Sequence, residues 1–453
     1  MENKDILDVV PKKLSQRALT DAFKAVRWSY KGKVCNVIGT IVEAILPNSQ
    51  LGTIVKIDVP GRSDQIVAEV VGYRQDKVLL LPYTHMNGVS PGCIIHSMSN
   101  FTRIPVGDFL LGKVVDPFLN PLNESSLEIP SNPHYHEIDQ AAPNPMERQR
   151  ITSPLSLGVR AIDGLLTLGQ GQRIGIMSGS GVGKSVLMGM MAKNSNADVN
   201  VIALLGERGR EVREFIERDL GQEGLARSVL VTVTSDQSPL MRIRGAKVAT
   251  TIAEHFSFQG RNVLLIMDSL TRVAQSQREI GNAIGESPTT RGYTPSVFSL
   301  LPKLLERTGP QILGRGSISG IYTVLVDGDD FNEPIADATR SILDGHINLS
   351  RTLAAKGHYP AIDITTSASR VMNDVISKEH RELATRIKSL LGTYQEKIDV
   401  VQIGAYQNGS NPALDEAIYL MPQIESFLRQ DIDEKCNLNE AVRTMQKIFE
   451  VRN

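Results

Sequence analysis

One short segment combines closely spaced glycines with a lysine and a hydroxyl, a set of groups suited to binding phosphate. It reads Ser178-Gly179-Ser180-Gly181-Val182-Gly183-Lys184-Ser185. Glycines let the backbone curl so that several N–H groups point at phosphate oxygens, and a helix that begins near Lys184 adds the positive end of its dipole. Lys184 offers a positive charge to the β- and γ-phosphates, and the Ser185 hydroxyl is a hard oxygen suited to Mg²⁺. An apolar run at 173–177 precedes the segment, so the sequence predicts a phosphate-binding loop between a strand and a helix.

The first position of this loop departs from the strict pattern, which has Gly where this chain has Ser178. That position shapes the start of the turn, so we expect a serine to be tolerated there. The competing interpretation is an accidental glycine-rich turn, and the strand before the loop and the helix after it argue against that. We predict nucleotide binding by residues 178–186, with Val186 in the first turn of the helix.

Two carboxylates follow other apolar runs and could complete such a site. Asp268 ends the run at 263–268, and the carboxyl end of a buried parallel strand lies beside the phosphates in folds of this kind. The alternative for Asp268 is a capping residue of the next helix. Glu207 follows the run at 199–205 and could orient a water molecule. A single Glu in a charged loop is usually only solvated, so this role depends on a resemblance described below.

The elements that must position these residues form an α/β pattern. Between about 151 and 370, β-rich runs alternate with helical stretches such as 184–193 and 210–219. The expected strands are 173–177, 199–205, 228–234, 262–267, 318–326 and 347–349. This alternation predicts a mostly parallel sheet with helices on both faces.

The segments on either side of this region have a different character. Four β-rich runs at 37–46, 53–59, 66–73 and 78–81 are separated by turn residues, which predicts a small β-barrel. Apolar residues recur at helical spacing after Met372, so we expect a helical end. The domains are therefore predicted as an N-terminal amphipathic arm at 1–30, the barrel at 31–98, the P-loop domain at 99–372 and the helical domain at 373–453.

Two segments leave alternatives open. The arm could be a surface helix packed on the next domain or a docking arm for a partner. The stretch at 106–150 is rich in Pro and Asn, which predicts an extended connection. It contains His134 and His136, two residues apart, but no third ligand is nearby in the sequence, so we do not expect a metal site there.

Charge and cysteine usage exclude several classes of protein. Lys and Arg number 49 and Asp and Glu 50, which leaves no basic surplus for nucleic acid or an anionic membrane surface. The apolar runs are too short to span a bilayer, and the charged first residues do not fit a signal peptide. Three scattered cysteines fit a reducing cytoplasm better than a disulfide framework.

Several segments resemble the rotary and export ATPase superfamily, which includes the F1 subunits and the ATPases of type III secretion. They are GSGVGKS at 179–185, GERGREVREF at 206–215, MDSLTR at 267–272, DGHINLSR at 344–351 and PAIDITTSASR at 360–370. Residues 291–309 and 322–351 are most similar to the type III protein export ATPases. Within that family, 142–151 and 403–418 resemble the flagellum-specific branch, with the virulence injectisome ATPases as the alternative.

The resemblance implies a RecA/F1-like core and a role for each matched site residue. These are Lys184 for phosphate, Ser185 and Asp268 for the metal, Glu207 with Arg208 for catalysis, Tyr359 for adenine and Arg370 as an arginine finger for the neighbouring subunit's nucleotide. Tyr359 could instead be a packed turn aromatic. The chain departs from the family at 116–123: where the family often shows a Gly and an Asp in the pattern DxxGxPLD, this chain reads Asp116-Pro117-Phe118-Leu119-Asn120-Pro121-Leu122-Asn123. Because Asn tolerates left-handed backbone, we expect the turn to survive.

The implied function is an ATPase that uses ATP and Mg²⁺ in a homohexameric ring and drives protein export. Its implied partners are export-apparatus regulator and stalk subunits, export chaperones, protein substrates and a membrane export gate, at the cytoplasmic face of the inner membrane. Other possibilities are a non-catalytic ring subunit, which Glu207 disfavours, and a catalytic F1-type subunit, which 322–351 disfavours. A hexameric nucleic-acid translocase would need a basic or aromatic face on the first domain, and residues 32–98 carry mixed charges and few aromatics.

Overall fold

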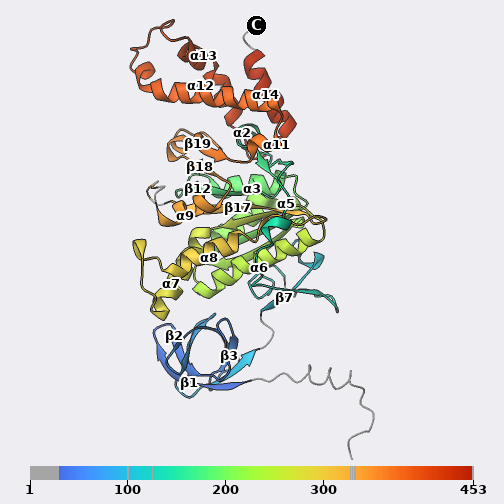
Figure 1. Cartoon of the computed structure of the whole chain (residues 1–453), viewed down its shortest axis with the longest axis vertical. Coiled ribbons are helices and arrows are strands. Elements are labelled where there is room, and N and C mark those ends of the chain that lie inside the picture. Colours follow the sequence, from blue (N-terminus) through green and yellow to red (C-terminus); the bar gives the residue numbers. More distant parts are fainter. Residues whose placement is uncertain are drawn as a thin grey trace, which may run out of the picture. The chain divides into compact units, whose positions relative to one another are not determined.

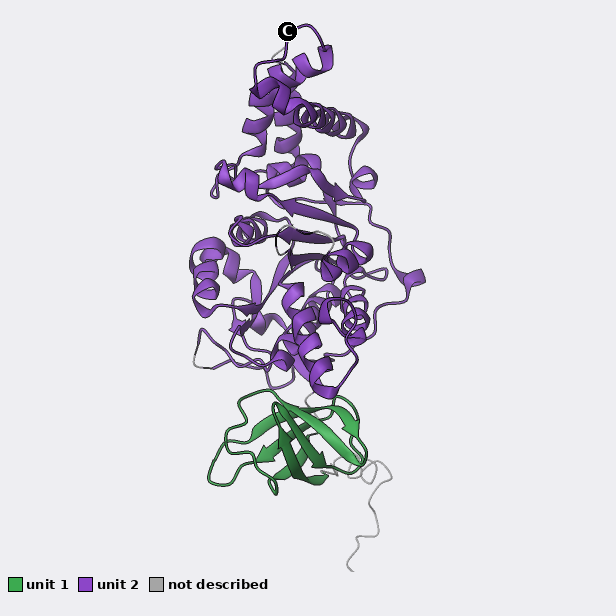
Figure 2. Ribbon diagram, turned by 90° about the vertical axis from the view of Figure 1, so that its left-hand side faces the viewer, with its two compact units in different colours: residues 1–101 green, residues 102–453 purple. Residues whose placement is uncertain are grey.

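The chain forms two compact units, residues 1–101 and 102–453, which Figure 2 shows in different colours. This computed structural model describes residues 30–98, 102–124, 126–326, 328, 330 and 333–450. The predicted amphipathic arm, apart from Tyr30, lies outside the described residues. The two units are therefore described separately.

The described residues of unit 1 form a closed antiparallel barrel in the order β1-β2-β5-β4-β3-β6, which confirms the predicted small barrel. Its strands are β1 (Lys31–Ile38), β2 (Ile41–Ile45), β3 (Ile54–Asp58), β4 (Ile66–Arg74), β5 (Lys77–Pro82) and β6 (Ile94–Met98). The expectation of one strand over 37–46 was wrong, because the chain turns at Gly39 with φ 57° and pairs Ile38 with Ile41. Alternate residues such as Val42, Val55 and Leu80 fill the interior.

The described part of unit 2 is built on a sheet in the order β19-β18-β12-β17-β15-β13-β14-β8, with β16 paired to β17 outside this path. All pairs are parallel except β18–β19 and β16–β17, so the predicted mostly parallel sheet is confirmed. The strands are β8 (Val114–Val115), β12 (Arg173–Ser178), β13 (Val199–Glu207), β14 (Ser228–Thr234), β15 (Val263–Asp268), β16 (Gly309–Pro310), β17 (Ser317–Leu325), β18 (Gly345–Leu349) and β19 (Ile362–Ser369). Its central strands β13 and β15 are mostly apolar and are buried along almost their whole length, because helices cover both faces.

The helices of this unit pack on both faces of the sheet (Figure 1). α6 (Pro239–Phe258), α7 (Leu270–Ile284) and α8 (Pro295–Leu305) follow one another over one part of the sheet, with α9 (Pro334–Ile342) beside α8. The phosphate loop leads into α3 (Lys184–Asn194), and the predicted helix at 210–219 is α4 (Gly209–Glu214) continued by a π-helical turn, η3 (Phe215–Leu220), before α5 (Gly221–Ala226). α2 (Arg160–Leu165) and α10 (Arg351–Ala355) are short.

The connection between the barrel and the P-loop strand contains only short elements in its described residues. β7 (Arg103–Val106) pairs with β9 (His134–Glu137), η1 (Asp108–Leu110) and η2 (Pro145–Glu147) are single 3-10 turns, and β10 (Pro154–Leu155) pairs with β11 (Leu168–Gly169). The many prolines explain why longer elements do not form here.

The end of the chain is helical, as predicted. It comprises α11 (Met372–Val375), α12 (Lys378–Gln402), α13 (Pro412–Leu428) and α14 (Leu438–Glu450). Ile387, Leu420 and Met445 from three of these helices join one apolar core with Ile162 of α2 and Ile176 of β12. None of the helices in the described residues has both the length and the apolar character that a membrane span requires.

Candidate active site

The phosphate loop begins where β12 ends and closes where α3 begins. Gly181 and Gly183 have φ of +79° and +88°, a left-handed conformation that residues with a Cβ rarely adopt. Gly179 is held closely, since a Cβ there would lie 2.4 Å from a guanidinium nitrogen of Arg351. Gly181 and Gly183 are therefore required by the backbone conformation, and the loop delivers Lys184 to the first position of α3.

The predicted loop residues divide into two groups in the structure. Seven of them line a cavity of about 510 Å³: Gly179, Ser180, Gly181, Gly183, Lys184, Ser185 and Val186. Ser178 and Val182 instead point away from it and are 1% and 2% exposed. Val182 packs in the apolar core below the loop. These two residues thus support the loop, while the other seven form the wall of the cavity.

Three predicted side chains meet at the carboxyl ends of neighbouring strands. Lys184 donates a hydrogen bond to Asp268, and its Nζ lies 3.8 Å from Oε1 of Glu207. The parallel register pairs Leu204 of β13 with Asp268 of β15, so Glu207 extends just beyond Asp268. Thr323 of β17, buried beside them, donates its hydroxyl to Asp268 Oδ1 at 2.6 Å and holds the carboxylate in place. The Lys184 ammonium therefore lies beside two carboxylates, those of Asp268 and Glu207.

Glu207 has an unusual affinity for protons. Burial raises its pKa to about 7, and the negative charge of Asp268 adds to the rise, while Lys184 opposes it. A carboxylate with a pKa near the working pH can accept a proton or hold a water molecule effectively. The geometry thus suits Glu207 to polarise a water beside the phosphate loop.

Two arginines lie at the same cavity. The side chain of Arg208 is 76% exposed and forms an ion pair with Glu211 at 3.2 Å. Arg272, on the first turn of α7, was not assigned from the sequence, although it ends the MDSLTR segment. Its Nε is buried and has no hydrogen-bond partner among the described residues. Such a donor would be satisfied by an anionic ligand in the cavity.

Tyr359 lies beside the loop, outside the lining of the cavity. A Cβ at Gly183 would lie 3.3 Å from Cε1 of the tyrosine ring, so the ring packs against the start of α3. Tyr359 is 46% exposed, and its carbonyl accepts a hydrogen bond from the backbone N–H of Gln430 at 3.0 Å. The backbone is thus anchored while much of the ring stays open to a planar ligand.

Arg370 is the one predicted site residue that lies far from the others. Its backbone N–H donates to the Asp344 carbonyl at 3.0 Å, and Asp344 accepts from the backbone N–H of Arg173 at 3.0 Å. Arg173 begins β12, whereas the phosphate loop follows the other end of that strand. Six residues of strand span roughly 17 Å, so Arg370 and the phosphate loop lie at opposite edges of the sheet. Arg370 therefore cannot reach the phosphate loop of its own chain.

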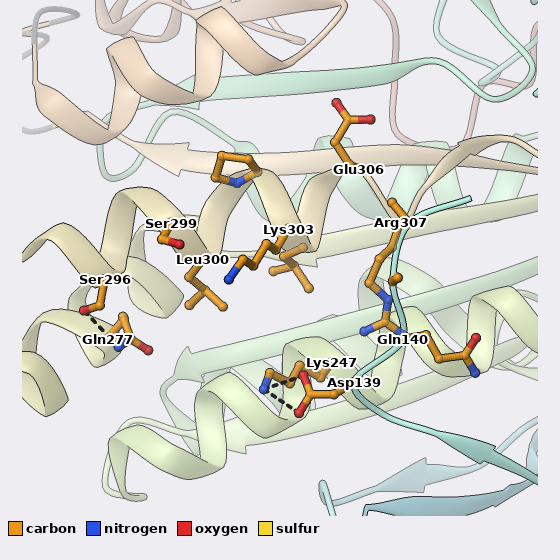
Figure 3. Close-up of a pocket in the computed structure, with 14 residues that line it drawn as sticks. Asp139, Gln140, Lys247, Gln277, Ser296, Ser299, Leu300, Lys303, Glu306 and Arg307 are labelled. Atoms are coloured by element: carbon orange, nitrogen blue, oxygen red, sulfur yellow. Dashed lines mark hydrogen bonds and ion pairs between the residues drawn. The ribbon is translucent and has the colours of Figure 1, made fainter. Parts of the chain in front are cut away.

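A larger cavity, of about 770 Å³, lies between α6, α7, α8 and residues 139–142 (Figure 3). Two interactions lie in its lining: Lys247 and Asp139 form an ion pair, and Gln277 donates to Ser296 at 3.0 Å. Its lining includes none of the predicted site residues and no glycine-rich loop of N–H groups. It therefore has the wrong groups for a triphosphate.

The two histidines of β9 have a neighbour that the sequence did not suggest. His255 of α6 lies with its Nδ1 3.4 Å from Nε2 of His136, and its ring centroid is 5.9 Å from that of His134. Burial and the other two histidines lower the pKa of His255 to about 4. Across the described residues, no group of three His, Cys, Asp or Glu side chains is arranged to hold a metal ion. The cluster joins β9 to α6 through the contact between His136 and His255, and burial lowers the pKa of both of these imidazoles.

Comparison with known proteins agrees with this geometry. Residues 34–98 match the ATP synthase alpha/beta family, beta-barrel domain; residues 158–369 match the nucleotide-binding domain of the same family; and residues 376–447 match the T3SS EscN ATPase C-terminal domain.

One curated relative is the Flagellum-specific ATP synthase of Bacillus subtilis, which is 51% identical over 95% of this chain and 96% of its own. The assembled ATPase EscN of the enteropathogenic E. coli type III secretion system has a similar structure, with a TM-score of 0.87, 46% identity and coverage of 92% of this chain and 99% of that one. EscN in complex with its central stalk EscO matches with a TM-score of 0.84, at the same identity and coverage.

Proposed function

The chain belongs to the family of flagellum-specific and type III secretion ATPases, and from this premise we propose how it hydrolyses ATP and what that hydrolysis drives. ATP is the substrate, in keeping with the nucleotide-binding domain. The observation that carries the mechanism is the meeting of Lys184, Asp268 and Glu207 at the carboxyl ends of adjacent strands beside the phosphate loop.

The proposed binding step uses the loop and its neighbours. Backbone N–H groups of residues 179–185 and the Lys184 ammonium bind the phosphates, and Tyr359 packs on the adenine. Ser185 and Asp268 offer hard oxygens at the cavity and would hold Mg²⁺, which neutralises charge on the β- and γ-phosphates. Binding of the anionic nucleotide draws Lys184 away from the carboxylates, since phosphate competes for the same ammonium.

In the proposed hydrolysis step, Glu207 orients a water molecule towards the γ-phosphorus. A bond forms between the water oxygen and this phosphorus, the bond to the bridging oxygen breaks, and ADP leaves with the electron pair. The water gives up its proton to Glu207 or to a phosphate oxygen. Arg208 and Arg272 at the cavity and Arg370 from a second subunit stabilise the negative charge of the transition state.

We infer a homohexameric ring, and the position of Arg370 supports a head-to-tail arrangement of its copies. The finger and the phosphate loop lie at opposite edges of the sheet, so a head-to-tail ring brings the finger of one copy to the loop of the next. EscN is known as an assembled ATPase and with a central stalk, which supports self-association and a stalk subunit as partner.

The proposed process is protein export of the flagellar type. The similarity of 142–151 and 403–418 to the flagellum-specific branch supports that type over a virulence injectisome. On this proposal the chain works in the cytoplasm, peripherally at the inner membrane, with regulator subunits, export chaperones, unfolded substrates and the export gate. Nucleic acid is not a partner.

The test of this function is phosphate release from ATP and Mg²⁺ at increasing protein concentration. Activity per subunit should rise as rings form, because a monomer holds one half of each site. Activity that stays flat across the range in which the protein assembles would refute the ring mechanism. Deletion of the gene in its host distinguishes the two types of export: loss of filaments supports the flagellar type, and loss of effector secretion with intact filaments refutes it.

A further inference from the structure

The two most exposed large apolar side chains of the described residues lie on neighbouring segments of unit 2. Met146, on η2, is 91% exposed, and Leu313, in the turn between β16 and β17, is 87% exposed. Single exposed apolar residues are common on monomers. Two at this level of exposure on paired segments require a physical reason.

Hydrogen-bonded backbone carries both side chains. Arg148 and Ile312 form an antiparallel bridge, and the Gln149 N–H donates to the Gln311 carbonyl at 3.1 Å. Met146 lies two residues before this bridge on one segment, and Leu313 lies one residue after it on the other. The Asn144 side chain accepts from the Met146 N–H at 3.1 Å and caps the 3-10 turn. The side chains are therefore presented to solvent by ordered backbone.

This ribbon, defined here as residues 144–149 and 311–315, is connected to Arg370 by a chain of polar contacts. The Arg148 guanidinium donates to the Thr308 carbonyl at 2.8 Å and also to the Glu306 carbonyl. The Glu306 carboxylate forms an ion pair with Arg173 at 2.7 Å. Arg173 in turn contacts Asp344, whose carbonyl accepts from the Arg370 backbone N–H. The ribbon and Arg370 thus share the amino-terminal edge of the sheet.

We propose that Met146 and Leu313 are apolar anchors of the contact between two copies of this chain, docking on the phosphate-loop edge of the neighbour. The inference rests on the proposed function, in which Arg370 reaches that same edge of a second copy. Because the ribbon is connected to Arg370, it approaches the neighbouring copy when Arg370 enters that copy's site. Because the backbone beneath them is already ordered, docking costs only the freedom of the side chains, and their burial adds the hydrophobic stabilisation that a single arginine cannot supply.

The experiment replaces both anchors with charge in the full chain, as Met146→Glu with Leu313→Glu. The matched control is Ile403→Glu, because Ile403 is 78% exposed and follows α12, in the helical end of the chain. Assembly is measured by sedimentation across a range of protein concentrations, ADP binding by fluorescence, and ATPase activity at each concentration. A second double variant, Met146→Leu with Leu313→Met, keeps the apolar character.

We expect the concentration at half-assembly to rise at least about tenfold in the glutamate double variant, as for the loss of interface anchors. ADP binding should stay at the wild-type level, and activity per subunit should recover at high concentration because neither residue touches the nucleotide. The Leu/Met variant and Ile403→Glu should assemble like the wild type.

An unchanged assembly midpoint in the glutamate double variant, or an equal shift in Ile403→Glu, would overturn the inference. A wild-type activity that does not depend on concentration would instead refute the proposed ring mechanism, so the two failures are distinguishable.

Discussion

Replacing Glu207 with glutamine should abolish hydrolysis and at the same time stabilise the nucleotide-free protein. Glutamine keeps the size of the side chain and resembles the protonated carboxyl, so it cannot polarise water as a carboxylate does. Burial raises the pKa of Glu207 from 4.5 to about 7, which means that ionisation is costly in the folded state. Removing the charge removes that cost.

The sign and size of the effect follow from proton linkage. Because the folded-state pKa is above the unfolded value, the folded protein binds the proton more tightly, and stability declines as the pH rises from about 4.5 to about 7. Ionisation of Glu207 lowers the free energy of unfolding of the wild type by about 3 kcal/mol above that pH range and by about 1 kcal/mol at pH 5. The free energy of unfolding of Glu207→Gln should therefore exceed that of the wild type at both pH values. The gain should be larger at pH 8 than at pH 5 by roughly 2 kcal/mol.

The assay is unfolding of the nucleotide-free protein at the two pH values, together with ADP binding and phosphate release. Glu217→Gln is the control, because the Glu217 side chain is 62% exposed and pairs with Arg213 on the surface. We expect Glu207→Gln to bind nucleotide, to hydrolyse none and to gain stability at pH 8. Hydrolysis near the wild-type rate would refute the catalytic role, and no gain in stability at pH 8 would refute the reasoning on burial.

Three other perturbations test the remaining assignments. Lys184→Ala should weaken ATP binding as well as hydrolysis, since the ammonium holds phosphate in both ground and transition states; binding at wild-type affinity would contradict this. Arg370→Ala should bind nucleotide normally, but its rate of hydrolysis should fall on the order of 10³-fold. After subunit exchange, a mixture of Arg370→Ala with Glu207→Gln should regain activity. Activity would not return if the finger acted in its own chain. Acid should destabilise the fold because the pKa of His255 is lowered to about 4 in the folded protein, so that the unfolded state binds a proton that the folded state does not. The free energy of unfolding should fall by about 2 kcal/mol between pH 7 and pH 5. His255→Gln should flatten this dependence in thermal unfolding, and an unchanged slope would exclude the cluster as its source.

Much of the site could be predicted from the sequence because the sheet is parallel. The carboxyl ends of parallel strands meet at one edge, so an apolar run ending at Asp268 and another leading to Glu207 were enough to bring both near the phosphate loop. Which side chains of the phosphate loop face the cavity and which are buried was not predictable in the same way. Ser178 and Val182 belong to the motif, yet the curl of the backbone turns them inwards.

Contacts between distant segments were the part that the sequence did not reveal. His255 is 119 residues from His136, and nothing in either segment indicates that α6 passes beside β9. The hairpin at Gly39 was missed because β-branched residues continue on both sides of the turn and give one apparent run. The distance between Arg370 and the phosphate loop required the register of β12, β18 and β19, which pattern alone does not supply.

The separation of Arg370 from the phosphate loop by the length of β12 also has a genetic consequence. On the proposed arrangement each copy contributes to two sites, its own and that of a neighbour. A copy defective in both Glu207 and Arg370 therefore silences both of the sites to which it contributes. In a cell that makes both kinds of copy, the share of working sites falls as the square of the normal fraction rather than in proportion to it. Such an allele should be dominant over the normal gene, whereas an allele that destroys the fold should be recessive.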